Sequence, residues 1–229
     1  MVKPISPSYN RTILHEDDPM YRGMRKRLVK ELARKGITDE RVLDAIGKVK
    51  RHFMIDLEFA NWAYKDIAFP IEANQTISMP YTVALQSQLL DIQDCEKVLE
   101  VGTGSGYQAA VLHEMGAKVY SIERQRALFE KTSRMLMKTG YQSIRTLYGD
   151  GYLGAERFAL FDKIIVTAGA KRFPDRLLTQ LKIGGIMVIP MESSDGQQMM
   201  RYVKTAEGSC RRENHGPCAF VPMLSGVNQ

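Results

Sequence analysis

Residues 98–110 read VLEVGTGSGYQAA, an apolar run that leads into three glycines at alternating positions. Val98–Val101 has the length and composition of a buried strand. Glycines at 102, 104 and 106 allow the backbone to turn tightly and to approach a ligand closely. An apolar strand followed by a glycine-rich turn and a helix predicts a site for a nucleotide-like cofactor.

The spacing of the glycines distinguishes between cofactors. A dinucleotide site is expected to read G-x-G-x-x-G, with the third glycine where the helix packs on the strand. Tyr107 occupies that position in this chain. The motif therefore favours S-adenosyl-L-methionine over a nicotinamide dinucleotide. A serine hydrolase is equally disfavoured, because the sequence contains no G-x-S-x-G.

Short apolar segments alternate with helical ones from Pro80 onward. This alternation predicts an α/β fold, a Rossmann-like, doubly wound and mostly parallel sheet. Ligands of such sheets bind where the carboxyl ends of the strands meet. The predicted strands are 98–101, 118–122, 144–148, 163–167 and 186–189, and the polar or glycine residues at their ends are Gly102, Glu123, Asp150 and Thr167.

An N-terminal helical cap is expected ahead of this core. Its first helix has apolar residues at Met24, Leu28 and Leu32 and stops at Gly36, and the second begins near Asp39. The predicted organisation is a polar N-terminal arm (1–20), the cap with the active-site segment (21–79) and the methyltransferase-like core with C-terminal strands (80–229).

The positive charge suggests nucleic-acid binding, but the arrangement of basic and aromatic residues does not support it. The formal net charge is +6, and much of it lies between residues 22 and 51. Nucleic-acid sites interleave basic residues with stacking aromatics, and no aromatic interrupts the run between Arg22 and His52. We therefore expect Arg25, Lys26 and Lys30 to form a solvated helix face, and no specific nucleic-acid partner.

The composition favours a cytoplasmic protein with free thiols. No apolar run approaches the length of about 18 residues that crosses a bilayer, and residues 1–20 lack the apolar stretch of a signal peptide. The cysteines, Cys95, Cys210 and Cys218, are odd in number and sparse. A metal site built from Cys210, His215 and Cys218 is disfavoured by its loose spacing and the lack of an evident fourth ligand.

A second motif narrows the resemblance to one family of proteins. Residues 75–81 read QTISMPY. Together with the glycine motif and with residues 119–124, 149–151, 161–168 and 184–190, this segment closely resembles the protein-L-isoaspartate O-methyltransferase family over roughly residues 20–205. Two departures are visible: Met79 stands where the family usually has glutamine, and the tail after Val221 is short and unfamiliar.

The resemblance implies an activity. Such an enzyme transfers methyl from S-adenosyl-L-methionine, releasing S-adenosyl-L-homocysteine, to the free α-carboxylate of L-isoaspartyl residues in damaged proteins and peptides. The methyl ester then closes to a succinimide, which starts repair. We expect a monomer with no membrane partner. The alternative is a methyltransferase that acts on a nucleic acid or a small molecule, because a cofactor site does not identify the acceptor.

Several side chains receive roles in the cofactor site. Glu123 lies 21 residues after Gly102, a separation at which an acidic residue at the end of the second strand can accept both ribose hydroxyls. Asp150 suits the adenine amino group, as the resemblance also implies. Glu100 either orders the glycine loop or meets the ammonium group of the ligand. Simpler alternatives are that Glu123 is a helix N-terminal carboxylate and that Asp150 is a cap.

Ser78 is the predicted catalytic residue. The resemblance assigns its hydroxyl to the substrate carboxylate, with Thr76 beside it; the alternative is a plain helix N-cap before Pro80. No general base is needed, because a main-chain carboxyl with a pKa of about 3.3 to 3.7 is ionised at neutral pH. The predicted cofactor contacts are Thr76, Ile77, Ser78, Glu100, Gly102, Thr103, Gly104, Ser105, Glu123, Arg124, Asp150 and Gly151.

Overall fold

A computed structural model describes residues 18–228. The expected arm thus lies mostly outside the described residues, although its last two positions are the first two residues of α1. The helices are α1 (Pro19–Arg34), α2 (Glu40–Lys48), α3 (Pro80–Leu90), α4 (Tyr107–Glu114), α5 (Arg126–Lys138) and α6 (Asp175–Thr179), with 3-10 segments η2 (Arg51–Phe53), η3 (Leu57–Trp62) and η4 (Glu156–Phe158).

The strands form one large sheet and one hairpin. The hairpin pairs β1 (Phe69–Ile71) with β2 (Gln75–Ile77). The large sheet contains β3 (Lys97–Val101), β4 (Lys118–Glu123), β5 (Arg145–Tyr148), β6 (Phe161–Val166), β7 (Leu181–Ser193), β8 (Gly196–Ala206) and β9 (Ser209–Pro217).

The order of the large sheet confirms the predicted doubly wound, mostly parallel fold. Within residues 18–228 the order is β5-β4-β3-β6-β7-β8-β9. The strands from β5 to β7 are parallel, and β8 and β9 continue the sheet in antiparallel fashion. The chain runs outward from β3 to β5 and then returns to the other side of β3, so the topological switch point lies beside β3. Ligands of open α/β sheets bind at this point.

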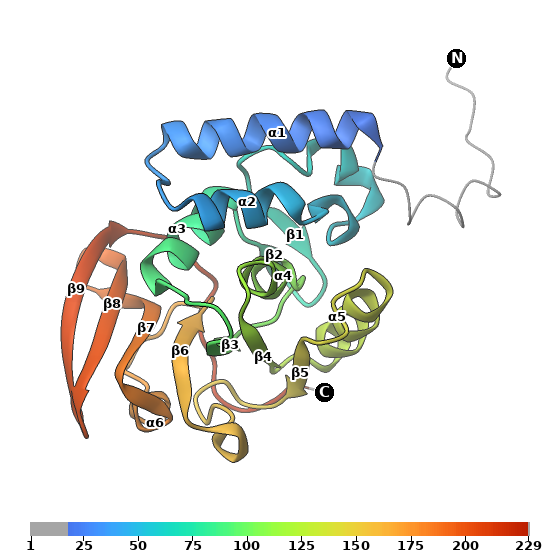
Figure 1. The fold of residues 1–229 in the computed structure, drawn as a ribbon. Helices are drawn as coiled ribbons and strands as arrows, with labels where there is room; N and C mark the ends of the chain where they lie inside the picture. Colours follow the sequence, from blue (N-terminus) through green and yellow to red (C-terminus); the bar gives the residue numbers. More distant parts are fainter. Residues whose placement is uncertain (1–17, 229) are drawn as a thin grey trace.

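Alternate residues of the central strands bury opposite faces of the sheet. Val98 on β3 belongs to the core beneath α3, α4 and the cap, whereas Leu99 belongs to the core that includes α6. Figure 1 shows α1 and α2 stacked above α3 and α4, with the sheet on their other side. The cap therefore rests on helices of the core rather than on the sheet itself.

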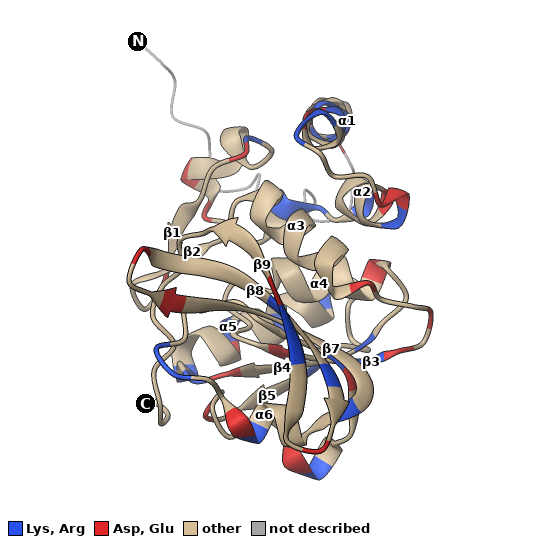
Figure 2. Cartoon of the chain, turned by 90° about the vertical axis from the view of Figure 1, so that its left-hand side faces the viewer, with Lys and Arg blue, Asp and Glu red and all other residues tan. Residues whose placement is uncertain are grey.

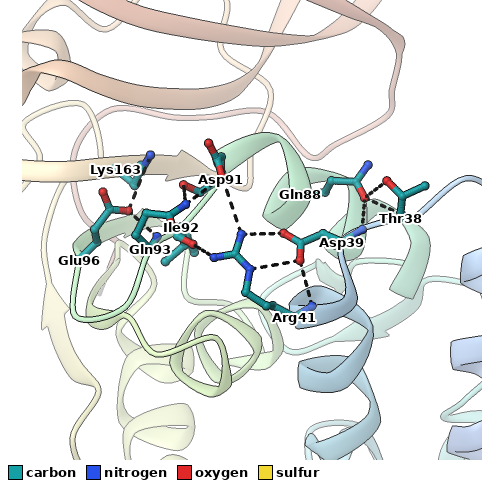
Figure 3. A network of polar contacts seen from close by, with 9 residues as sticks. All are labelled: Thr38, Asp39, Arg41, Gln88, Asp91, Ile92, Gln93, Glu96 and Lys163. Atoms are coloured by element: carbon teal, nitrogen blue, oxygen red, sulfur yellow. Dashed lines mark hydrogen bonds and ion pairs between the residues drawn. The ribbon is translucent and has the colours of Figure 1, made fainter.

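The cap helices begin at side-chain caps and are tied to α3. Asp18 and Asp39 accept hydrogen bonds from backbone N–H groups in the first turns of α1 and α2. The amide oxygen of Gln88 on α3 accepts from the backbone of Thr38 and Asp39 at 2.7 and 2.9 Å. Arg41 donates to the carbonyl of Ile92 at 2.6 Å, as Figure 3 shows. The far end of α3 is thereby fixed to α2.

The structure corrects the expected solvated face of α1. Lys26 and Lys30 are exposed, but Arg25 is only 6% exposed. Its Nε donates to the carbonyl of Gly47 at 2.8 Å and its Nη1 donates to the Tyr64 hydroxyl at 3.1 Å. Arg25 thus joins α1 to the rest of the cap. Lys and Arg also occur along β7–β9, so the positive charge is not confined to α1 (Figure 2).

Three further findings concern membrane-spanning helices, metal sites and cysteines. None of the helices between residues 18 and 228 is long and apolar enough to cross a membrane. In the described part of the chain, no three His, Cys, Asp or Glu side chains come together in a way that could hold a metal ion. Cys95, Cys210 and Cys218 are all free thiols.

We predict that Arg25→Ala lowers the free energy of unfolding by about 2 to 4 kcal/mol, because buried hydrogen bonds of a charged group are lost. Its exposed neighbour on the same helix supplies the control: Lys26→Ala should change stability by about 0.5 kcal/mol or less. Urea denaturation of both variants measures the difference. Equal, small losses would show that Arg25 is not a buried anchor.

Candidate active site

A cleft opens where the carboxyl ends of the central strands meet. Segments that follow β3, β4, β5 and β6 line one part of it, and the β1–β2 hairpin with the residue after it lines another. The expected convergence at one edge of the sheet is therefore observed for most of the site. The predicted site residues that line the cleft are Thr76, Ile77, Ser78, Gly102, Thr103, Gly104, Ser105, Glu123, Arg124 and Gly151.

Gly102 is required where β3 meets β6. Its φ of +101° is in the left-handed region, and a Cβ there would lie 2.4 Å from the Oγ1 of Thr167. The Thr167 hydroxyl donates to the carbonyls of Gly102 and Val101 at 2.7 and 3.0 Å. Neither the backbone nor the available space accepts a side chain at this position.

Glu123 braces the glycine loop from the neighbouring strand. Its carboxylate accepts the backbone N–H of Gly104 at 2.9 Å and that of Gln125 at 2.8 Å. Each carboxylate offers about four lone-pair sites, so two such bonds leave acceptor capacity on the cleft side for the paired hydroxyls of a ribose. The residue thus fits its predicted partner while also ordering the loop.

Gly106 has a different task from the other two glycines. Its φ is +81°, and a Cβ would lie 2.9 Å from the Thr132 side chain of α5. It is not part of the cleft lining. The expectation that all three glycines let the chain approach the methionine part of a ligand therefore does not fit Gly106, which permits close packing of the loop on α5.

Glu100 lies beneath the loop and not on the cleft. It is fully buried, and Ser121 donates its hydroxyl hydrogen to one carboxyl oxygen. The Ser121 hydroxyl also bonds to the hydroxyl of Thr103 at 2.6 Å. The other oxygen of Glu100 has no partner among the described residues. Of its two predicted roles, the geometry favours ordering the loop over meeting an ammonium group.

Burial also sets the protonation state of Glu100. Removal from water raises its pKa to about 8, because a low-dielectric environment disfavours the charged carboxylate. At neutral pH Glu100 is therefore mainly a neutral acid beneath the loop.

Asp150 holds the C-terminal tail. Its two oxygens accept the backbone N–H of Tyr152 at 2.8 Å and of Gly226 at 2.6 Å. The carboxylate does not line the cleft, whereas the adjacent Gly151 does. Because Asp150 is absent from the cleft lining, its position differs from the direct adenine contact predicted for it, and its carboxylate instead holds the tail.

Ser78 and Thr76 border two cavities. Both line the main cleft and also a second hollow, the Ser78 hollow, which is further lined by Met79, Thr82 and residues 219–221. The N-cap of α3 is Met79, without a side-chain hydrogen bond. The hydroxyl of Ser78 bonds to no other residue in 18–228. The alternative of a plain helix cap at Ser78 is therefore wrong.

Part of the cleft wall, formed by the C-terminal tail, was not predicted from the sequence. The tail is held by the backbone of Gly169, which donates to the carbonyl of Val221 and accepts from Met223, both at 2.8 Å. No local pattern in the sequence predicts this contact. Thr167 was expected at this edge from its place after a strand. The lining residues outside the predicted site set are Asn74, Gln75, Val83, Tyr107, Gln108, Gln125, Thr167, Ala168, Val221, Pro222, Met223 and Leu224.

Comparison with known proteins places this geometry in a family. The family model described as protein-L-isoaspartate(D-aspartate) O-methyltransferase matches residues 23–228. The chain belongs to this family. A protein-L-isoaspartate O-methyltransferase of Christiangramia forsetii is 53% identical over 213 residues, which cover 93% of this chain and all of the relative. One of Flavobacterium psychrophilum is 48% identical with the same coverage.

Solved structures of family members share the fold. One protein-L-isoaspartate O-methyltransferase superposes with a TM-score of 0.79 at 26% identity, covering 89% of this chain and 67% of its own. A Plasmodium falciparum enzyme in complex with S-adenosyl-L-homocysteine gives 0.77 at 24% identity, covering 87% and 98%. The predicted family, enzyme class and fold are confirmed, and so is S-adenosyl-L-methionine, the cofactor of this family.

The buried acid beneath the loop generates a pH prediction. Glu100 has a pKa of about 8 in the folded protein against 4.5 for an ordinary glutamate. Between these values the folded state binds one more proton than the unfolded state, so the free energy of unfolding falls as the pH rises through this window. Glu100→Gln, which is neutral throughout, should show a flatter dependence.

Urea denaturation at pH 5.5, 7 and 8.5 measures this slope. Glu58→Gln, at an exposed position of η3, is the matched control and should keep the wild-type slope. If Glu100→Gln retained that slope as well, Glu100 would not be the group that titrates.

Proposed function

We propose that the protein transfers the methyl group of S-adenosyl-L-methionine to the free α-carboxylate of L-isoaspartyl residues in damaged proteins and peptides, and so starts repair through a succinimide. The observation that carries this proposal is the position of Ser78. In a chain of this family, its hydroxyl, which has no hydrogen-bond partner in residues 18–228, borders both the glycine-loop cleft and the Ser78 hollow.

The cleft has the shape and donors for the cofactor. The left-handed glycines at 102 and 104 leave backbone beside the cleft without side chains. The N-terminus of α4 follows the loop and favours a carboxylate such as that of the methionine part. We assign Glu123 to the ribose hydroxyls and Gly151 to the adenine side. Glu100 and Asp150 act indirectly, by ordering the loop and the tail.

Ser78 and Thr76 are assigned to the acceptor. When bound, the cofactor supplies an electrophilic methyl group on a sulfonium. An acceptor carboxylate is ionised at neutral pH, so the site needs no base and must only orient it. The hydroxyl of Ser78 donates a hydrogen bond to one carboxylate oxygen and so directs the other oxygen toward the methyl group. The buried side chains of Ile77, Val83 and Tyr107 line the cleft and limit water near the reacting oxygen.

Partners and compartment follow from the same proposal. The partners are isoaspartyl-containing proteins and peptides, the chain acts as a monomer, and no specific nucleic acid is bound. A cytoplasmic location is supported by the three free thiols, which suit a reducing compartment.

The acceptor is tested with matched synthetic peptides that differ only in one isoaspartyl or aspartyl linkage. We predict faster methylation of the isoaspartyl peptide by about 100-fold or more, because an ordinary aspartate presents its carboxylate displaced from the main chain, and a misplacement of about 1 Å costs that much. Equal methylation of both peptides, or transfer to RNA or a small molecule instead, would contradict the proposed acceptor.

The same assay tests Ser78. Ser78→Ala should lower kcat strongly and leave cofactor affinity nearly unchanged. Wild-type kcat in this variant would remove Ser78 from the acceptor site without affecting the cofactor assignment.

The ribose assignment gives a separate prediction. Glu123→Ala should weaken S-adenosyl-L-homocysteine binding by about 2 to 4 kcal/mol, roughly 30- to 1,000-fold in Kd, because two charge-assisted hydrogen bonds are lost. Isothermal titration calorimetry measures this, with Glu130→Ala on the exposed face of α5 as control. An unchanged Kd in Glu123→Ala, with a wild-type melting temperature, would exclude the ribose contact.

A further inference from the structure

The segment that carries Ser78 is short and lies between two regular elements. β2 ends at Ile77, which pairs with Phe69 in the hairpin. α3 begins at Pro80. Ser78 and Met79 are thus the whole connection. The strand pairing fixes one end of this connection, so the position of Ser78 depends on what fixes the first turn of α3.

The first turn of α3 lacks a cap from its own sequence. Pro80 has no backbone N–H, and Met79 at the N-cap position cannot accept a hydrogen bond from the helix as serine or aspartate does. The first available donor is the N–H of Tyr81. The carboxylate of Asp66 accepts it at 2.7 Å. The cap therefore comes from a residue 15 positions earlier in the chain, in the loop before β1.

This hydrogen bond closes the open end of the hairpin. Asp66 precedes β1, and Tyr81 follows β2 by four residues. The pairing of Phe69 with Ile77 and the bond from Tyr81 to Asp66 are two successive cross-links between the same two stretches of chain. Ser78 lies between them, so its backbone is constrained from both sides.

Asp66 is itself held in place. Its second carboxylate oxygen pairs with the Nζ of Lys35 at 2.7 Å. Lys35 is the residue after α1 and also pairs with Glu31 at 2.7 Å. Only 9% of the Asp66 side chain is exposed, against 42% of that of Lys35. The positive charge of Lys35 offsets the cost of burying the Asp66 carboxylate. The hydrogen bond to Asp66 in turn raises the pKa of the Lys35 amine.

We propose that Asp66 is a positioning residue for methyl transfer: by accepting the N–H of Tyr81 it fixes the start of α3 and thereby the hydroxyl of Ser78 in the acceptor site. The inference rests on the proposed role of Ser78. Asp66 lines neither the cleft nor the Ser78 hollow, so it acts through the backbone. The other end of α3 is tied separately by Gln88.

A cap that only stabilised the fold would behave differently, and the chain contains a matched control. Asp39 is also an aspartate that accepts a backbone N–H in the first turn of a helix, at 2.9 Å from Arg41. It caps α2 and lines neither of the two cavities beside Ser78. The Asp39 carboxylate also pairs with the guanidinium of Arg41 at 3.0 Å. Asp39→Ala therefore reports the loss of a helix cap and of this ion pair at the far end of α3, away from the turn that carries Ser78.

The experiment compares kcat on an isoaspartyl peptide, the Kd of S-adenosyl-L-homocysteine and the melting temperature in the full chain. Asp66→Ala should lower kcat about 10- to 100-fold, the range expected for a displaced reacting group, and change the Kd by less than about twofold. Asp66→Asn keeps an oxygen acceptor for Tyr81 and should restore most of kcat. Asp39→Ala should lower the melting temperature and keep the wild-type kcat.

Double variants separate this inference from the proposed function. If Asp66 acts through Ser78, then Ser78→Ala combined with Asp66→Ala should be no slower than Ser78→Ala alone. A slow Ser78→Ala beside an Asp66→Ala with wild-type kcat overturns the inference and leaves the proposed function intact. Wild-type kcat in Ser78→Ala overturns both the role of Ser78 and the inference. Additive losses in the double variant show that Asp66 acts elsewhere.

Loss of folding in Asp66→Ala would not prevent the test. Asp66→Glu keeps the charge and the pair with Lys35 but moves the carboxylate by one methylene. It should fold and show the lowered kcat at unchanged cofactor affinity. Wild-type kcat in Asp66→Glu would overturn the proposal.

Discussion

The close approach of β3 and β6 at their carboxyl ends is the constraint on which the cofactor cleft depends. Gly102 leaves β3 between two neighbours, with its N–H bonded to Ile122 on β4 at 2.9 Å and its carbonyl bonded to Thr167 after β6 at 2.7 Å. No side chain fits there. The sheet therefore sets the path of the loop. It places Gly104 beside Glu123, at the end of the adjacent strand β4, where the two residues form a hydrogen bond.

The loop is further ordered from below by a polar chain in the core. Glu100, Ser121 and Thr103 are all buried, and Ser121 forms hydrogen bonds to both of the others. A carboxyl group in such a place is tolerable as a neutral acid, since ionising it away from water is unfavourable. Because these bonds form on folding, the loop is already ordered before any ligand arrives, and binding then requires less loss of conformational freedom.

The parts of this arrangement that could be predicted are local in sequence. The apolar runs, the glycines and Pro80 identify the parallel strands and the start of α3 within a few residues. No sequence motif predicts the antiparallel pairing that joins β8 and β9 to the sheet. Nor does any predict the hydrogen bond between Asp150 and Gly226, which are 76 positions apart. The prediction that Arg25 is solvated was wrong, although the sequence contained the signal for burial. Arg25 lies three residues before Leu28, which lies four before Leu32, so all three share one helical face.

The two halves of the site have different origins. The cofactor side is built by the parallel sheet, whereas the acceptor side is built by segments outside it, the one around Ser78 and the one around Val221. Gln197 on β8 fixes the second segment by bonding both the N–H and the carbonyl of Phe220, at 2.7 and 3.1 Å. Methyl transfer depends on sub-ångström alignment across these halves. With Ser78 assigned to the acceptor as proposed, acceptor choice depends on these added segments, and this is why the glycine motif alone predicted the cofactor and not the substrate.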